Sequence, residues 1–140
     1  MAQDYGTFSV AINDPGADDK QIPVLEAAAD VFGGGLTVLW AKAEVHTSVT
    51  NSQGAGGTTF TLQLMKRSNA STPAVNGTVS TNIVGGTAEG WTAGVPHAFT
   101  IDPDYAFLDA GESLVVDYQE INSGSPSGNV IVYGGYVRGK

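Results

Sequence analysis

The stretch TTFTLQLM, Thr58 to Met65, alternates polar and apolar side chains with a period of two. Phe60, Leu62 and Leu64 fall on one face of an extended chain, and the residues between them fall on the other. A helix would need apolar residues three or four positions apart. The stretch therefore predicts a β-strand with one face against a hydrophobic core.

Other segments share this alternation and are separated by the turn residues of a chain that contains 19 glycines. The predicted strands are Thr7 to Asn13, Leu36 to Thr47, His97 to Ile101, Ser113 to Ile121 and Val130 to Val137, with short edge strands expected around Val79 and Ile83. The first half of Leu36 to Thr47 is apolar on both sides, which indicates a strand that is buried at one end or bent by a β-bulge. The pattern predicts an all-β fold, an antiparallel two-sheet β-sandwich or jelly roll.

Helix-forming composition is confined to PVLEAAADVF, Pro23 to Phe32. We expect at most one short helix near residues 23–32, and an extended conformation fits this segment equally well. A chain of 140 residues is sufficient for one core. We therefore predict a single β-sandwich domain over residues 7–140, preceded by a short N-terminal arm over residues 1–6.

The charge balance is acidic, with 6 Lys and Arg against 14 Asp and Glu and a formal net charge of -8. This balance opposes binding to nucleic acid, whose phosphates attract basic clusters. No apolar run approaches the ~18 residues of a membrane-spanning helix, and the first residues lack the pattern of a secretory signal, so we expect no membrane association. Cysteine is absent, which excludes disulfides and thiolate metal sites.

The sequence contains no recognisable catalytic motif, and we predict that the protein is not an enzyme and has no cofactor. The two histidines, His46 and His97, have no companion at metal-ligand spacing, and no G-x-S-x-G, P-loop or G-x-G-x-x-G motif is present. No catalytic, cofactor-binding or metal-binding residue is therefore assigned.

Two acidic stretches have the oxygen-rich composition of calcium-binding loops. They are Asp102, Asp104, Asp109 and Glu112, and the weaker set Asp14, Asp18 and Asp19. The ordered spacing of an EF-hand loop is missing from both. We interpret these carboxylates as turn caps and predict no metal site.

The two tryptophans are candidates for burial or for contact with a partner. Trp91 lies in the loop-like sequence EGWTAG, where an aromatic ring either plugs the end of a sandwich or meets a partner, and plugging is favoured. Trp40 lies in a strand between Leu39 and Ala41, which indicates a core position or an intersubunit contact.

The second half of the chain resembles head decoration, or cement, proteins of tailed bacteriophages. The resemblance rests on FTLQL (residues 60–64), GTA (86–88), AFTID (98–102) and LDAGESLVVDY (108–118). It implies a jelly-roll subunit, often a homotrimer, that binds the outside of an assembled lattice of major capsid protein and stabilises it. It implies a place on the capsid surface of the virion after synthesis in the host cytoplasm.

Capsid contact in such proteins is commonly made by an N-terminal arm, which here is short. The partner-contact residues predicted on this basis are Gln3, Asp4 and Tyr5, together with Trp91. The alternative hypothesis is a carbohydrate- or receptor-binding β-sandwich module of a phage fibre or a secreted protein. An exposed row of Trp or Tyr side chains would favour that alternative.

Overall fold

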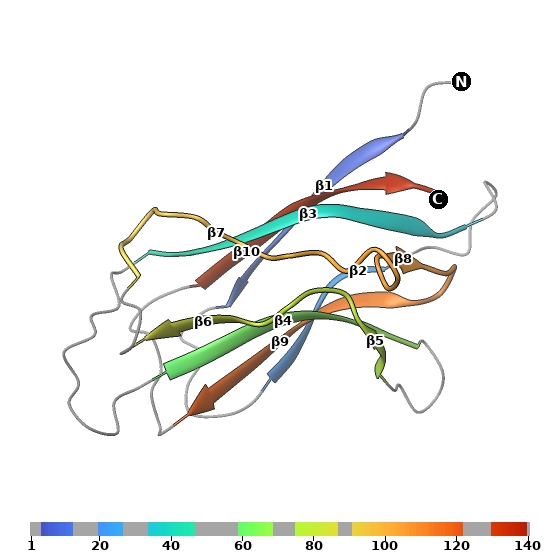
Figure 1. Cartoon of the computed structure of the whole chain (residues 1–140). Coiled ribbons are helices and arrows are strands. Elements are labelled where there is room, and N and C mark those ends of the chain that lie inside the picture. Colours follow the sequence, from blue (N-terminus) through green and yellow to red (C-terminus); the bar gives the residue numbers. More distant parts are fainter. Residues whose placement is uncertain are drawn as a thin grey trace.

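A computed structural model describes residues 4–12, 20–26, 34–46, 59–68, 75–86, 91–121 and 130–139, which form two antiparallel β-sheets packed face to face (Figure 1). The strands are β1 (Tyr5–Ile12), β2 (Lys20–Glu26), β3 (Leu36–Val45), β4 (Thr59–Arg67), β5 (Val75–Thr78), β6 (Ile83–Gly86), β7 (His97–Ala98), β8 (Phe107–Leu108), β9 (Ser113–Ile121) and β10 (Val130–Arg138). The described residues contain no helix. The predicted all-β sandwich is confirmed.

The connections between the sheets give the sandwich its jelly-roll topology. Sheet A has the order β1-β10-β3, and both β7 and β8 pair with β3. Sheet B has the order β2-β9-β4, and both β5 and β6 pair with β4. The chain crosses from one sheet to the other after β1, β2, β3, β6, β8 and β9. Strands that are distant in sequence, such as β1 and β10, are consequently neighbours in space.

The hydrophobic core lies between the two sheets and contains the stretch that predicted the fold. Phe60, Leu62 and Leu64 of β4 are fully buried, as are Leu114, Val116 and Tyr118 of β9. These two strands pair over nine residues, from Thr59 with Ile121 to Arg67 with Ser113. The period-two pattern of the sequence therefore indicated correctly which side chains enter the core.

Of the two conformations that the sequence left open for residues 23–32, the extended one is present in residues 23–26. Residues 20–26 form β2, which pairs with β9 at the edge of sheet B. Pairing with a buried central strand overrides the helical tendency of this short segment. Pro23 is accommodated because an edge strand tolerates a residue that lacks an N–H, and the register of β2 shifts between Pro23 and Leu25. Residues 27–32 lie outside the described residues.

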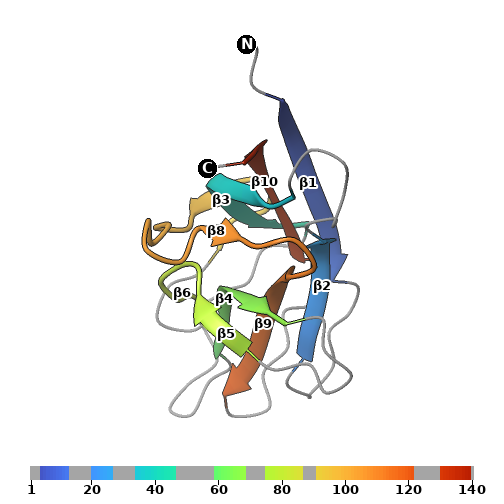
Figure 2. The same ribbon diagram turned by 90° about the vertical axis from the view of Figure 1, so that its right-hand side faces the viewer.

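The first strand begins earlier than the sequence predicted. Tyr5 and Gly6, assigned to an N-terminal arm, belong to β1 and pair with Val137 and Tyr136 of β10. Figure 2 shows β1 and β2 on the same side of the sandwich, each at the edge of its sheet. Residues 1–3 lie outside the described residues. The division into an arm and a domain remains a prediction.

Candidate contact surface

A β-bulge in β3 turns two consecutive large apolar side chains toward the outside. Gly135 of β10 is opposite Trp40, and the next residue, Tyr136, is opposite Val38, so Leu39 is the extra residue. Val38 and Ala41 on either side are buried, whereas Leu39 is 45% exposed and Trp40 is 43% exposed. A bulge shifts the alternation by one residue, which explains why the sequence is apolar on both faces here. The bulged alternative predicted for this strand is confirmed.

The indole of Trp40 lies on the outer side of sheet A, directly over Gly135. A Cβ at Gly135 would stand 3.0 Å from Cε2 of the indole, so only glycine allows this close approach. Tyr133, two residues before Gly135, meets Trp40 edge to face with ring centroids 6.1 Å apart. Lys42 Nζ lies 5.9 Å from the indole centroid, within the range of a cation–π interaction. These contacts place the exposed Trp40 and the half-buried Tyr133 against each other on the outer side of the sheet.

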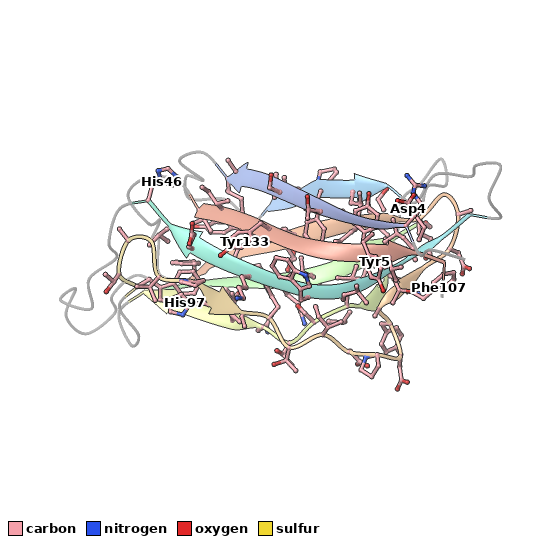
Figure 3. All side chains as sticks on the ribbon, turned by 90° about the horizontal axis from the view of Figure 1, so that it is seen from above. Asp4, Tyr5, His46, His97, Phe107 and Tyr133 are labelled. Atoms are coloured by element: carbon pink, nitrogen blue, oxygen red, sulfur yellow. The ribbon has the colours of Figure 1, made fainter. Side chains whose placement is uncertain are left out.

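We call this side of β1, β10 and β3 the outer face of sheet A. Figure 3 looks onto it and shows Tyr133 in the middle of the sheet and Tyr5 toward one end. Its exposed or half-buried side chains include Tyr5, Thr7, Ser9, Ala11, Thr37, Leu39, Trp40, Lys42, Glu44, Ile131 and Tyr133. Large exposed apolar groups that gather on one face are typical of surfaces that bind another molecule.

The outer face of sheet B has a different chemistry. Between its core positions β4 presents Thr61 and Gln63, and β9 presents Asp117 and Gln119. Asp117 is buried, and its Oδ2 accepts a hydrogen bond of 2.9 Å from Gln119 Nε2. The two faces of the sandwich are therefore unequal, and the aromatic one belongs to sheet A.

Charged groups have only small effects on the outer face of sheet A. Partial burial raises the pKa of the Tyr133 phenol, and the negative charge of Glu44 adds to this effect. The phenol is therefore neutral at physiological pH. At one end of the face, Arg138 Nε contacts Asp4 Oδ2 at 3.0 Å, and because both side chains are well exposed this ion pair contributes little to stability.

The predicted partner-contact residues do not lie together in the structure. Asp4 and Tyr5 lie at the start of β1, and Tyr5 is 64% exposed on the outer face of sheet A. Gln3 lies outside the described residues. Trp91 is only 1% exposed, so its assignment as a contact residue is corrected: it has almost no accessible surface.

Trp91 belongs to the core, in agreement with its interpretation as a plug. Its ring stacks on His97 with centroids 3.9 Å apart and planes 8° apart. It also meets Phe60 edge to face, with centroids 5.1 Å apart. Strand β7, which carries His97, is thereby fastened to the core through the aromatic ring.

Two of the four acidic residues from Asp102 to Glu112 cap turns, as interpreted from the sequence. The carboxylate of Asp102 accepts a hydrogen bond of 3.0 Å from the Asp104 N–H. The carboxylate of Glu112 accepts one of 2.8 Å from the Asp109 N–H. These patterns are those of Asx-type and related turns. Asp14, Asp18 and Asp19 lie outside the described residues.

A hollow of about 470 Å³ lies beside this turn region and is lined by Thr37, Lys66, Pro103, Asp104 and Phe107. The ammonium of Lys66 donates to the Phe107 carbonyl at 3.1 Å and lies 3.8 Å from Glu112 Oε1. The ammonium of Lys66 is therefore already engaged by other groups of the protein.

Within the described ranges, no three His, Cys, Asp or Glu side chains gather in a way that could hold a metal ion. His46 is exposed at the end of β3, whereas His97 is packed on Trp91. The same part of the chain contains no helix that is long and apolar enough to cross a membrane.

Sequence reasoning missed Leu39 and Tyr133 as surface residues. The signals that point to them are the double glycine at 134–135, which leaves room beside β10, and the apolar run LTVLWA in β3, which cannot alternate without a bulge. Neither signal shows by itself which side of the sheet meets solvent.

Comparison with known proteins does not assign this chain to a family. No family model matches the chain, and no curated protein matches it. A chain in the structure of Desmodium yellow mottle tymovirus is similar over 99% of this chain and 88% of its own length, with 11% identity and a TM-score of 0.40. A chain in the structure of Turnip yellow mosaic virus at 100 K is similar over 99% and 94%, with 10% identity and a TM-score of 0.36.

Proposed function

We propose that this chain is a structural protein of a virus particle that binds the outside of an assembled phage capsid and stabilises it. The observation that carries the proposal is the exposure of Leu39 and Trp40, side by side, on the outer face of sheet A. The resemblance of the sequence to phage decoration proteins indicates the class of partner that this face would bind. The proposed contact surface is this face, and its proposed partner is the lattice of major capsid protein.

The face has the properties expected of a protein contact surface. Trp and Tyr are enriched among the residues that dominate binding energy, since they bury a large area at a low cost in conformational entropy. Trp40 and Tyr133 are held against each other before any partner arrives. A preorganised surface loses less entropy on binding than a flexible one.

Stabilisation of the capsid would follow from mass action. A protein that binds the assembled lattice, and does not bind separate capsid subunits, lowers the free energy of the assembled state by an amount that grows with its concentration. This role requires no catalytic group, and we propose that the protein is not an enzyme. The formal net charge of -8 supports a protein partner over nucleic acid.

The test is binding of the purified protein to candidate phage shells, measured by cosedimentation and by the temperature at which the shell disrupts. Saturable binding with a raised disruption temperature is expected for the natural sequence. Trp40→Ala should weaken binding at least tenfold. The matched control is Gln63→Ala, on the outer face of sheet B, which should bind as the natural sequence does. Equal binding by both variants would refute the assignment of the face.

The same exposed aromatic pair favours a second candidate function, recognition of carbohydrate. A sugar ring stacks on the flat face of Trp or Tyr, and the neighbouring Thr7, Ser9 and Lys42 offer polar groups. Retention on immobilised glycans, lost in Trp40→Ala, together with no affinity for any shell, would replace the capsid proposal with this one.

A further inference from the structure

The outer edge of β1 is the longest open sheet edge that the described residues show. Tyr5–Ile12 pairs with β10 on one side, and no other described strand pairs with it. Across the sandwich, the opposite border of each sheet is formed by short strands: β7 and β8 have two residues each, and β5 and β6 have four. An extended strand with an open edge is a template for pairing with another strand.

The direction of the backbone groups on β1 follows from one hydrogen bond. The Arg138 N–H donates to the Asp4 carbonyl at 2.9 Å, so Asp4 directs its backbone groups toward β10. In an antiparallel ladder this direction alternates from residue to residue. Thr7, Ser9 and Ala11 therefore direct their N–H and C=O groups away from β10, toward the open edge.

The composition of β1 leaves this edge unprotected. YGTFSVAI contains no charged residue and no proline, although the chain has a formal net charge of -8. Strand β2, on the same side of the sandwich, contains Pro23 and a register shift beside it (Figure 2). Proline and irregular register are common devices that prevent edge-to-edge pairing. Among the described strands, β2 at the edge of sheet B therefore carries such a device and β1 at the edge of sheet A does not.

We propose that the open edge of β1 pairs antiparallel with β1 of a second copy of this chain, across a two-fold axis. The absence of charge on the strand permits this self-pairing, because no like charges meet when two identical edges approach. A two-fold contact also closes on itself and uses the same surface of both copies, so neither edge remains open.

One two-fold register forms hydrogen-bonded pairs between residues with small side chains only. With Ser9 opposite Ser9 of the second copy, Thr7 lies opposite Ala11 of that copy and Ala11 opposite its Thr7. All three residues then form hydrogen-bonded pairs, and each pair exchanges two N–H···O bonds. The side chains brought together at the edge are small, which allows close approach. The outer faces of the two sheets A would become one continuous surface, with Trp40 and Tyr133 of each copy on it.

This inference concerns the edge of β1 and does not depend on the partner proposed for the outer face of sheet A. A loss of capsid binding in Trp40→Ala and a loss of self-association in Ser9→Pro are separate results. The decoration resemblance implies a trimer, whereas a two-fold contact produces a dimer, so molecular mass discriminates between the two arrangements.

The experiment is sedimentation equilibrium over a hundredfold range of concentration. The natural sequence should approach twice the subunit mass of 14.4 kDa at the highest concentration. Ser9→Pro removes an N–H that points away from β10, so it should keep the fold and reduce the association constant at least tenfold. Ser9→Ala keeps that N–H and serves as the matched control, with the association of the natural sequence.

A monomer at every concentration, a trimer, or a Ser9→Pro protein that folds and still associates would each overturn the proposal. Circular dichroism checks the fold of the proline variant. If that variant does not fold, hydrogen exchange in the natural sequence provides the decision: the amides of Thr7, Ser9 and Ala11 should be protected at high concentration and lose protection on dilution. Rapid exchange at all concentrations would exclude pairing at this edge.

Discussion

The ring of Trp40 lies over the outer side of Gly135, and the ring of Phe8 lies over the inner side of the adjacent Gly134. The two glycines of β10 thus leave room for one aromatic side chain in the core and for another on the surface. This arrangement connects the packing of the sandwich with its candidate contact surface, since both depend on the absence of a Cβ at neighbouring positions.

The two glycines should respond differently to alanine. In Gly134→Ala the new Cβ meets the Trp40 carbonyl oxygen and stands 2.5 Å from Phe8 Cζ. The carbonyl belongs to a paired strand and cannot move aside easily, so we expect a loss of about 2–3 kcal/mol in the free energy of unfolding. Gly135→Ala meets an exposed indole that can swing away, and about 0.5–1 kcal/mol is expected. Urea denaturation followed by circular dichroism measures both, and equal losses would contradict the packing described for β10.

Substitution of the two tryptophans by alanine should also lower the free energy of unfolding by different amounts. Trp91 is buried against Phe60 and His97, so Trp91→Ala should lower the free energy of unfolding by about 3–5 kcal/mol. Trp40→Ala, on the outer face of sheet A, should lower it by less than about 1 kcal/mol. A large loss in the Trp40 variant would show that this side chain is a structural element and not a contact residue.

Ser80 is expected to be a sensitive buried polar position. Its hydroxyl accepts a hydrogen bond of 2.9 Å from the Leu64 N–H and donates one of 2.9 Å to the Thr81 carbonyl. Ser80→Ala leaves the Leu64 N–H without this acceptor, so a loss of about 1–3 kcal/mol in unfolding free energy is expected. Thr81→Ala, at an exposed neighbour, is the control and should stay within about 0.5 kcal/mol of the natural sequence.

Alkaline pH should destabilise the protein through Tyr133. Because the folded state raises the pKa of this phenol above its ordinary value of about 10, folding favours the neutral form. The contribution is fully present below pH ~10 and is lost as pH rises through the raised folded pKa. Melting temperatures between pH 8 and pH 11 should fall less in Tyr133→Phe than in the natural sequence. Identical profiles would exclude a differential contribution from this tyrosine.

Calcium should leave the melting temperature unchanged. Asp102 and Glu112 already accept hydrogen bonds from backbone N–H groups, which accounts for their place in the turns. Asp102→Ala should lower the free energy of unfolding by about 1 kcal/mol through loss of that bond. Thermal denaturation in millimolar calcium and in a chelator tests the first statement, and a rise of several degrees with calcium would contradict it.

The strands were the most predictable part of the molecule, as TTFTLQLM illustrates. Its alternation is a local property of the backbone, so the inward positions of Phe60, Leu62 and Leu64 could be derived from the sequence. Residues 23–26 were less predictable. Their composition fits a short helix, and only pairing with β9 determines that they form a strand.

The candidate contact surface was less predictable than the fold. Trp40 and Trp91 were both candidates for either burial or contact, because a local pattern cannot distinguish the two faces of a strand from each other. Trp91 enters the core through its contact with Phe60, which lies in a distant part of the chain, and through stacking on the nearby His97. The exposure of Leu39 depends on a bulge whose place is fixed by pairing with β10.

The sequence by itself determined that this protein is an all-β sandwich, because side-chain alternation and turn residues act over a few positions. Its acidic charge and its lack of cysteine and catalytic motifs are equally properties of the sequence. Only the tertiary structure decided the strand order, the open edge of β1 and the outward position of Leu39 and Trp40. These features arise from pairing between segments as distant as β1 and β10, and the free energy that selects such pairs belongs to the assembled core.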